Sequence, residues 1–365
     1  MIGIERLRAA HASRRAEPAP LTWYALAPTI ALAATGTVAV IVVAMCLGTT
    51  RISPATTLGV LGDHLLGVSA GSHSASADAI VWEIRAPRVL LAALVGATLA
   101  FAGAAYQAIF RNPLAEPYIM GVAAGASVGA TLVIVSPLAI TAGVLSPLPP
   151  AAFAGALIAV SLAYGLARVG TTVPSASLIL SGVAVSSVGT SLVTYLMLAY
   201  NTRTLAILNW ILGSFNTASW TKVAIASPYA LVAFAVILPF GRVLNVLQLD
   251  ETEARHLGVD VDRVRLIVLV AASLATAAAV AVSGLIGFVG LIVPHAVRLV
   301  WGPDYRRVLP LAAFCGASFL VLMDLIARSA DATFELPIGV VTALIGAPCF
   351  LLLLRRQGRA IEVRP

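Results

Sequence analysis

The chain has 365 residues, of which 60% are hydrophobic and only 11% are charged, and its formal net charge is +7. A soluble domain carries about a quarter of its residues as charged side chains. The composition therefore excludes a soluble globular protein and predicts an integral membrane protein. A nucleic-acid-binding role for the basic balance is also disfavoured, because no basic cluster is interleaved with aromatic residues.

Residues 1–24 are polar and contain no small-residue cleavage site, so we predict a cytoplasmic tail that is retained. A membrane-spanning helix needs roughly 20 mostly apolar residues. The candidate spans are residues 25–47, 88–108, 118–135, 151–168, 176–199, 225–240, 264–283, 285–301, 308–327 and 337–354. These runs are too long for barrel strands. The predicted fold is an all-α integral membrane protein with about ten transmembrane helices in one domain, residues 25–356, followed by a cytoplasmic tail, residues 357–365.

The distribution of basic residues between the spans predicts the orientation. With the N-terminus in the cytoplasm, 16 of the 23 Lys and Arg residues fall in cytoplasmic segments and 6 in external segments. Arg298 lies inside the eighth predicted span. This bias follows the positive-inside rule and predicts that both termini are cytoplasmic.

The lysine and cysteine residues limit the functions that this chain can have. Lys222 is the only lysine, so the phosphate-binding pattern GxxxxGK[ST] of an ATPase cannot be present. Cys46, Cys315 and Cys349 all fall in predicted spans and are interpreted as small core residues rather than disulfide partners. We predict neither a metal site nor catalytic residues, and hence no enzyme.

The first informative segment is RAPR, residues 85–88, at the external start of the second span. Arg85 and Arg88 are expected on one outward-facing helix end, and Arg328 is a further external cation. Snorkelling to the membrane interface would explain such residues singly. Because all of them oppose the positive-inside bias, a negatively charged external partner is the better explanation.

The second segment, FRNPLAEP at residues 110–117, is predicted to be a cytoplasmic turn, because Pro113 and Pro117 interrupt a helix. Asn112 lies in the same turn, and Gly121, Gly125 and Gly129 follow at a spacing that permits close helix packing. Two interpretations remain open. The glycines serve helix packing, or they belong to a discontinuous helix that lines a substrate path.

The third segment, residues 247–259, is the most polar internal stretch and falls on the cytoplasmic side. Acidic residues come first and basic residues last, which suits a short helix that ends at a glycine. We predict that this helix docks into another protein rather than lying on an anionic lipid surface. The residues concerned are Asp250, Glu251, Glu253, Ala254, Arg255, His256, Leu257 and Gly258.

The fourth segment, GLIGFVGLIVPH at residues 284–295, has a glycine at every third position and then a proline. Gly284, Gly287, Gly290 and Pro294 are expected to break or tighten a helix within the membrane. His295 is interpreted as a packing residue, with a proton relay as the alternative.

Taken in order, these segments resemble the FecCD-type permease family, the transmembrane subunits of type II ATP-driven importers for iron-siderophores, haem and cobalamin. RAPR, FRNPLAEPYIMGVAAGASVG, LDETEARHLGVDVDRVR, GLIGFVGLIVPHAVRL and ELPIGVVTALIGAPCFLLLLRR carry the resemblance, which covers roughly residues 80–356. The N-terminal tail and residues 49–80 fall outside it.

The resemblance implies a ten-helix subunit that pairs with a second permease subunit, expected to be a copy of itself, with spans 2–5 and 7–10 related as inverted repeats. It implies that Arg85, Arg88 and Arg328 meet acidic residues of a periplasmic or lipid-anchored substrate-binding protein. It also implies that residues 247–262 contain the coupling helix, which enters a cleft of the ATPase subunit. Two ATP-binding subunits would hold ATP and Mg²⁺, and this chain would bind no cofactor. The location implied is the bacterial inner membrane, with lipid around the subunit.

A pathway for the substrate is assigned to the fifth span, where hydroxyl groups alternate with small residues. A weakly polar wall suits a bulky ligand that has to pass without sticking, although helix packing explains small residues equally well. The candidates are Ser181, Ser186, Ser187, Thr190 and Ser191.

The substrate expected from the resemblance is a ferric siderophore, with haem and cobalamin as alternatives. His64 and His73 of the external loop could contact haem iron, but they are better explained as bystanders. An alternative of another class is a gradient-driven secondary transporter. Such proteins carry ionisable residues within their spans, whereas here His295, Arg298 and Asp324 lie near span ends.

Overall fold

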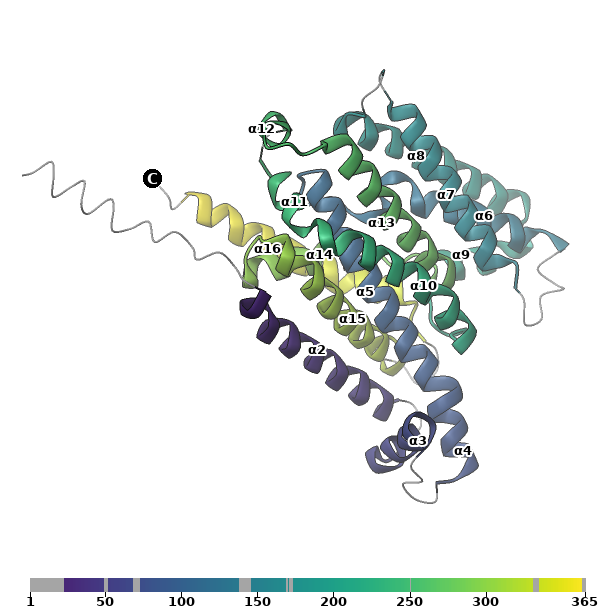
Figure 1. Ribbon diagram of the computed structural model, residues 1–365. Coiled ribbons are helices and arrows are strands. Elements are labelled where there is room, and N and C mark those ends of the chain that lie inside the picture. Colours follow the sequence, from purple (N-terminus) through teal and green to yellow (C-terminus); the bar gives the residue numbers. More distant parts are fainter. Residues whose placement is uncertain are drawn as a thin grey trace, which may run out of the picture.

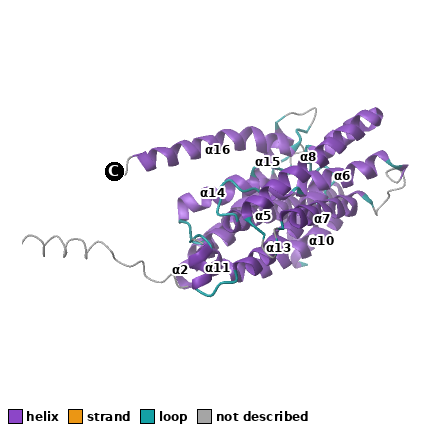
Figure 2. Cartoon of the chain, turned by 90° about the horizontal axis from the view of Figure 1, so that it is seen from above, coloured by secondary structure: helices purple, strands orange, loops and turns teal. Residues whose placement is uncertain are grey.

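The computed structural model describes residues 23–48, 52–67, 73–137, 146–168, 170, 173–249, 251–330 and 335–362. All of the regular structure in this part of the chain is helical (Figures 1 and 2). Seven helices are long and apolar enough to cross a membrane, and three shorter apolar helices occupy the remaining predicted spans. The all-α fold with ten spans is therefore confirmed.

The spans follow the predicted order closely. They are α2 (Trp23–Cys46), α5 (Ala86–Ile109), α6 (Val122–Val135), α7 (Leu148–Ala167), α8 (Ser175–Ala199), α10 (Trp220–Ile237), α13 (Val261–Ser283), α14 (Val289–Trp301), α15 (Tyr305–Ser329) and α16 (Ile338–Glu362). α16 is longer than expected, because it continues into the segment that we predicted to be a cytoplasmic tail.

Several helices lie where the sequence suggested only connections. α3 (Pro54–Leu66) and α4 (Ala75–Asp78) occupy the external loop, and a π-helical segment, Ala79–Arg85, joins α4 directly to α5. The apolar stretch Ala75–Ile109 is thus 35 residues long, about 52 Å at 1.5 Å per residue. Because the hydrocarbon core of a bilayer is only about 30 Å thick, this helix extends beyond it. α9 (Thr204–Ile211) and α11 (Gly241–Val246) are further short helices in connections.

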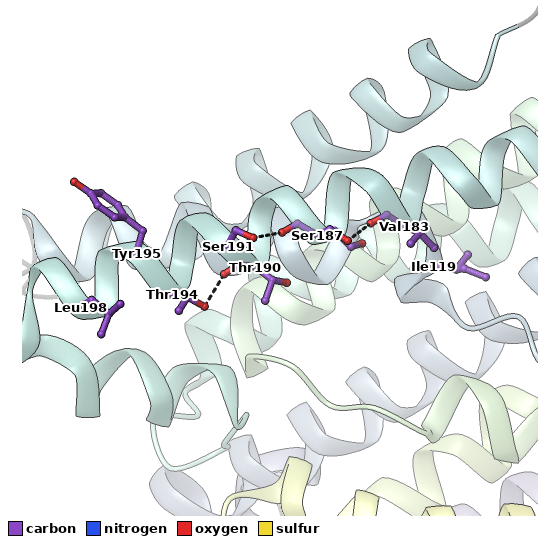
Figure 3. Close-up of a pocket in the computed structure, with 9 residues that line it drawn as sticks. Ile119, Val183, Ser187, Thr190, Ser191, Thr194, Tyr195 and Leu198 are labelled. Atoms are coloured by element: carbon purple, nitrogen blue, oxygen red, sulfur yellow. Dashed lines mark hydrogen bonds between the residues drawn. The ribbon is translucent and has the colours of Figure 1, made fainter.

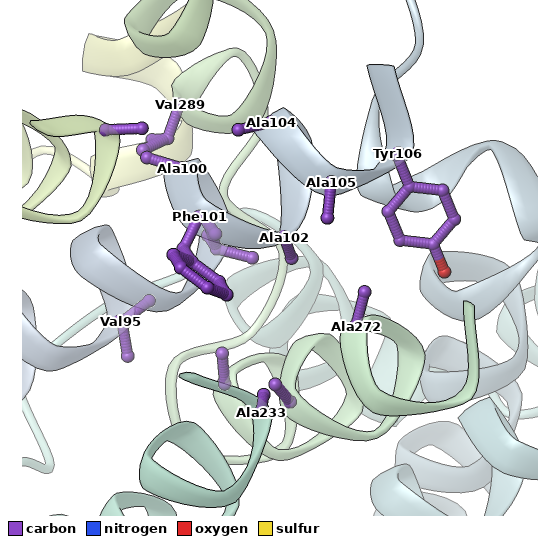
Figure 4. Packing of buried hydrophobic residues seen from close by; sticks show 14 of the residues in the cluster. Val95, Ala100, Phe101, Ala102, Ala104, Ala105, Tyr106, Ala233, Ala272 and Val289 are labelled. Atoms are coloured by element: carbon purple, nitrogen blue, oxygen red, sulfur yellow. The ribbon is translucent and has the colours of Figure 1, made fainter. Parts of the chain in front are cut away.

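The core is built around α5, which packs against α10, α13, α14 and α15. Small side chains on α5 allow these helices to approach closely, and Figure 4 shows alanines alternating with Phe101 and Tyr106. The Phe101 ring lies edge-on to Phe234 of α10, with centroids 4.5 Å apart. This geometry is favourable for aromatic pairs and fills the space that the alanines leave.

α5 and α13 run antiparallel. Just before α13, Gln248 Nε2 donates to the carbonyl oxygen of Ala108 at the end of α5, at 3.1 Å. At the opposite end, Ser283 at the end of α13 shares a cavity with Glu335, which pairs with Arg88 in the first turn of α5. The molecule therefore has an α12 end, named after α12 (Glu251–His256), and an α3 end.

The packing pattern agrees with the predicted inverted repeat. α5, the first helix of the first half, packs against α14 and α15, the second and third helices of the second half. Conversely, α13, the first helix of the second half, packs against α6 and α7. Such an exchange is expected when two halves are related by a two-fold axis in the membrane plane.

Candidate functional site

Two helix interruptions that lie far apart in the sequence contact each other. The α-helical conformation is interrupted after α5, at residues 111–121 (the first break), and again after α13, at residues 284–288 (the second break). The Phe288 backbone N–H donates to Glu116 Oε1 at 2.8 Å. Tyr118 Oη donates to the Ile286 carbonyl oxygen at 2.9 Å and lies 3.1 Å from the Ile286 N–H, which donates to it. The two breaks thus satisfy each other's polar groups, as unwound backbone in a membrane protein requires.

The first break begins with local turn chemistry. Arg111 has a positive φ of 49°, which is uncommon for a residue other than glycine. Asn112 Oδ1 then accepts a hydrogen bond from the Leu114 N–H at 2.9 Å, and Pro113 cannot continue the helix. Pro117 opens a short 3₁₀ turn, Pro117–Met120, that ends at Gly121 with a φ of +80°. The structure therefore has a turn at these residues, and its cytoplasmic location stays a prediction.

The second break depends on Gly284, whose φ is +71°, and it continues through Gly287 to Phe288. Gly290 and Pro294 were predicted to belong to the interruption, but both lie inside α14. Gly290 instead permits close packing, because a Cβ there would lie 2.6 Å from Pro117 Cδ. The glycine periodicity therefore combines one helix break, at Gly284, with one packing contact, at Gly290.

Glu116 is a residue that the sequence analysis did not single out. It lies in the first break, where its Oε1 accepts the hydrogen bond from the Phe288 N–H. Nothing in its place between two prolines in a polar turn distinguishes it from a solvent-facing residue. Only the docking of the second break against it reveals its central position.

An open hollow of about 690 Å³ runs along α8 (Figure 3). Ser186, Ser187, Thr190 and Ser191 line it, whereas the fifth predicted pathway residue, Ser181, does not. Ser187 and Ser191 donate to carbonyl oxygens four residues earlier in α8. Since those hydroxyl protons are used within the helix, the wall presents acceptor oxygens beside apolar side chains such as Val183 and Leu198.

Gly121 and Gly125 position the first break and α6 beside α8 and α7. A Cβ on Gly121 would lie 3.2 Å from Val185 of α8, and one on Gly125 would lie 2.3 Å from the Gly155 carbonyl oxygen of α7. Ile119 from the first break is also part of the wall of the α8 hollow. The broken segment and the hollow are therefore contiguous.

The polar segment at the α12 end contains a helix of six residues, α12, which is shorter than the predicted stretch of 247–262. It ends in a glycine-type cap, in which Gly258 has a φ of +81° and the Val259 N–H donates to the Ala254 carbonyl oxygen at 3.1 Å. Ala254 is fully buried. Glu253, Arg255, His256 and Gly258 are exposed, and Leu257 is 65% exposed. Asp250 lies outside the described residues, and the side chain of Glu251 is not described.

The three arginines at the α3 end lie differently from what the sequence suggested. Arg85 and Arg328 are only 4% and 5% exposed. Arg85 Nη1 donates to the carbonyl oxygen of Met45 at 2.9 Å, and Arg328 Nη2 donates to that of Ala44. The expected outward presentation is therefore corrected for both residues. The last turn of a helix has unpaired carbonyls and a partial negative charge, so the end of α2 attracts these guanidinium groups.

Arg88 takes part in an internal ion-pair network. Its Nη2 lies 2.9 Å from Asp324 Oδ1, and its Nη1 lies 2.9 Å from Glu335 Oε2. Asp324 is buried, whereas the Glu335 side chain is 36% exposed. A fork of guanidinium donors matches two carboxylates at once. Glu335 therefore connects this buried pair to the surface. Docking of an external partner at these arginines stays a prediction.

His64 and His73 are both engaged by one carboxylate. Their Nε2 atoms lie 3.0 Å and 3.3 Å from Asp78 Oδ1, and the His64 ring stacks on Trp82 with centroids 4.2 Å apart. These contacts support the interpretation of both histidines as parts of the α3 end rather than as ligands.

Comparison with known proteins decides the family. The sequence profile of the FecCD transport family matches residues 36–356. The chain belongs to the FecCD transport family. The match also covers residues 49–80, which had seemed to lie outside the resemblance.

Relatives of known name agree with this membership. A cobalamin import permease of Halobacterium salinarum is 48% identical over 78% of this chain and 76% of its own length. An Fe(3+) dicitrate transport permease of Escherichia coli K12 is 43% identical over 76% of this chain and 86% of its own length. A hemin transport permease of Yersinia pestis is 39% identical over 76% and 84%, respectively.

A solved structure extends the comparison to the fold. An inward-facing metal-chelate type ABC transporter has 31% sequence identity and a TM-score of 0.78, covering 90% of this chain and 99% of its own. Because the FecCD relatives are named as permeases, this chain is a multi-pass membrane permease and not an enzyme. The sequence prediction of both points is confirmed.

Proposed function

We propose that the chain is the permease subunit of an ATP-driven importer for a bulky metal chelate. The observation that carries the proposal is the family match over residues 36–356, together with relatives named for the transport of cobalamin, hemin and ferric dicitrate. ATP and Mg²⁺ would be bound by two separate ATPase subunits. The gradient-driven alternative has no comparable support.

The proposed path lies along α8. In a single chain, most of this apolar helix is exposed, including Leu180, Val188 and Leu198 at 69%, 70% and 78%. A second permease subunit, which we propose to be a copy of this chain, would face α8 across the path. Ser186, Ser187, Thr190 and Ser191 would then form a weakly polar wall past which the chelate moves without chemical change.

The proposed coupling element is α12 with its glycine cap. The preceding segment is held to α5, because Gln248 donates to Ala108 and Arg111 Nη1 donates to the Leu249 carbonyl oxygen at 3.2 Å. A displacement of α12 by the ATPase would therefore act on the end of α5. That helix leads directly into the first break, beside the α8 hollow.

The proposed docking surface for a periplasmic or lipid-anchored binding protein is the α3 end, where Arg88 pairs with the partly exposed Glu335, while Arg85 and Arg328 are buried behind it. Acidic residues of that partner would compete for Arg88 with Glu335, which is the exposed member of this ion pair. Complementary charges of this kind set orientation and association rate. We further propose that the chain resides in the bacterial inner membrane, with both termini and α12 in the cytoplasm.

The finer proposal for the substrate is a ferric siderophore. A specific observation favours cobalamin as a second candidate, since the relative with 48% identity is named for cobalamin import. The two candidates require the same permease mechanism and differ only in the ligand that the hollow and the binding protein accept.

The test is ligand-resolved uptake. Cells with and without this chain are supplied separately with a ferric siderophore, haem and cobalamin, and the partner ATPase is inactivated in a parallel strain. We expect uptake of one ligand to be lost in both mutant backgrounds. Uptake that persists without the ATPase would refute the ATP-driven mechanism, and uptake of every ligand without this chain would refute the proposed function.

A further inference from the structure

A second cavity, distinct from the α8 hollow, lies at the α3 end and has a volume of about 660 Å³. Its walls come from α9, the starts of α7 and α10, the end of α13 and the residues just before α16. Its size falls within the usual range for ligand pockets, about 300 to 1,000 Å³. Its lining is rich in polar groups, including Asn209, Asn216 and Thr217.

The only lysine of the chain, Lys222, lines this cavity. Its Nζ donates to Thr217 Oγ1 at 2.6 Å. An ammonium group has three protons to donate, and among the described residues Thr217 is its single hydrogen-bond partner. Within the same part of the chain, no carboxylate lies within ion-pair distance of it. Among the described residues, Lys222 is therefore a half-buried cation without a counter-ion.

Glu335 also lines the cavity, but it does not neutralise Lys222. Its carboxylate is directed to Arg88, with an Oε2 to Nη1 distance of 2.9 Å. Since Arg88 binds Asp324 as well, the carboxylates near the cavity wall are already paired with guanidinium groups. An anionic group that entered the cavity would find the ammonium of Lys222 available.

The wall that carries Lys222 is firmly held. The Ser214 N–H donates to the Ser283 carbonyl oxygen at 2.8 Å, and the Ile338 N–H donates to that of Gly213 at 3.1 Å. Beside Lys222, Trp220 Nε1 donates to the Trp82 carbonyl oxygen at 3.0 Å. These bonds join the residues after α9 to α13 and α16, and α10 to the π-helical segment before α5, so the wall that carries Lys222 is fixed before any ligand arrives. A preorganised group loses less entropy on binding.

We propose that this cavity is a substrate subsite in which Lys222 binds a carboxylate group of the transported metal chelate. Asn209 and Asn216 are exposed on the same wall, and their amides supply further donors for a carboxylate oxygen. The subsite favours anionic chelates over neutral ones of similar size. The inference rests on the proposed importer function and adds a specificity determinant on the side where the substrate enters.

The presence of a single lysine permits a direct binding test. Reductive ¹³C-methylation of the full-length permease in detergent, before its reconstitution into nanodiscs, labels only Lys222 and the N-terminal amine of this chain. We expect the Lys222 resonance to shift saturably on titration with ferric dicitrate, which carries carboxylates, and not with a neutral ferric hydroxamate. A resonance that responds to neither probe, or equally to both, would overturn the assignment.

Uptake kinetics test the same residue in the whole importer. We expect Lys222→Gln to raise the KM for the anionic chelate about tenfold with little change for the neutral one, and Lys222→Arg to retain most of the affinity. Arg203→Gln is the matched control, because it removes one positive charge from the α8–α9 connection without lining the cavity. An equal effect of Lys222→Gln and Arg203→Gln would show a general surface-charge effect and refute the subsite. If the wild-type protein moves no chelate at all, the proposed function fails first.

Discussion

Arg85 and Arg328 illustrate what a charged residue in a membrane protein can do without facing a partner. Both were selected from the sequence because they oppose the positive-inside bias. In the structure they donate to the last carbonyls of α2, and Gly48 leaves the room that the Arg85 guanidinium fills, since a Cβ there would lie 2.9 Å from Nη2. The bias against positive charge outside can therefore be overcome by a helix C-terminus as well as by an acidic protein.

At the same scale, Asp304 provides a prediction about pH. Its Oδ1 accepts hydrogen bonds from the Arg306 N–H at 3.0 Å, capping α15, and from Asn245 Nδ2 at 2.7 Å. Its Oδ2 lies 2.7 Å from Arg306 Nη2. Burial alone would raise the pKa of Asp304, but the hydrogen bonds from Arg306 and Asn245 outweigh it, and the pKa lies below its ordinary value.

A lowered pKa in the folded state means that the Asp304 carboxylate stabilises the fold above its ordinary pKa, about 3.9, and that this contribution is lost as the pH falls through the lower folded value. We expect Asp304→Ala to reduce the free energy of unfolding at pH 7 by about 1–2 kcal/mol, as for loss of a helix cap. Thermal unfolding in detergent at pH 7 and below pH 4 measures this. The variant should differ from wild type less at the lower pH, and an undiminished difference there would contradict the assignment.

Single residues could be predicted where the backbone itself requires them. Gly121, Gly258 and Gly284 were selected from sequence, and all three have positive φ values. Glu116 and the ion-pair network of Arg88 could not be predicted, because both depend on contacts across more than 150 positions of sequence, to Phe288, Asp324 and Glu335. A single sequence contains no signal for such pairs.

At the scale of helices, α5 and α14 approach each other closely where Gly103 faces Gly290, a contact that the sequence analysis did not predict. A Cβ on Gly103 would lie 2.0 Å from the Gly290 carbonyl oxygen, a separation that no rotamer change can relieve. The contact fixes the start of α14 against α5 and thereby sets the position of both breaks.

We therefore expect Gly103→Ala to push these helices apart, with a destabilisation at the upper end of the roughly 1–3 kcal/mol typical of overpacking and loss of uptake. The matched control is Gly165→Ala in α7, where nothing lies within 4 Å of the added Cβ. There the same change should be neutral or should stabilise by about 0.5–1 kcal/mol, because alanine favours the helix. The test is to measure the unfolding temperature and the uptake rate of both variants. If Gly103→Ala and Gly165→Ala changed these quantities equally, α5 and α14 would not be in contact.

The short helix α12 leads to a prediction about assembly. Leu257 is 65% exposed at its end, an apolar side chain next to charged ones on a polar segment. If it enters the ATPase surface, Leu257→Ala should weaken copurification about tenfold, which corresponds to about 1.4 kcal/mol. Leu114→Ala is the control, since Leu114 is 47% exposed in the first break and lies outside α12. Normal ATPase copurification with the Leu257 variant would refute the coupling role of α12.

The positions of the membrane-spanning helices could be predicted, because a long apolar run is a strong signal. The short helices α3, α4 and α9 could not be predicted. α9 has eight residues and α4 has four, too short to form stably alone. They exist because of their surroundings. Ser53 and Ser74 cap α3 and α4, and the residues after α9 bond to α13 and α16. Because these helices depend on contacts with the rest of the fold, their own sequences did not predict them.

For the whole molecule, the antiparallel arrangement of α5 and α13 gathers the basic residues at two ends, although they are scattered along the sequence. Arg111, Arg168, Arg242, Arg255, Arg263, Arg306 and Arg307 lie in or beside the connections at the α12 end. Arg85, Arg88, Arg203, Lys222 and Arg328 lie toward the α3 end. The sequence predicted the bias, the number of spans and the repeat. The convergence of the two breaks could not be predicted, since it depends on how the two halves exchange helices.

This arrangement makes orientation the prediction with the widest consequences, because coupling, docking and the Lys222 subsite all depend on which end faces the cytoplasm. Replacing Cys46, Cys315 and Cys349 with alanine gives a cysteine-free background. Thr252 in α12 and Ser76 in α4 are both exposed and lie at opposite ends of the molecule, so each serves as the other's control when changed singly to cysteine.

With the α12 end in the cytoplasm, a membrane-impermeant maleimide should label Ser76→Cys in intact spheroplasts and label Thr252→Cys only after permeabilisation. The physical reason is the asymmetric charge of the two ends, since segments rich in arginine are retained on the cytoplasmic side during insertion. Labelling in the reverse pattern would place α12 outside, where no ATPase could reach it. It would also place the Lys222 cavity on the cytoplasmic side, so the importer mechanism and the entry subsite would fail together.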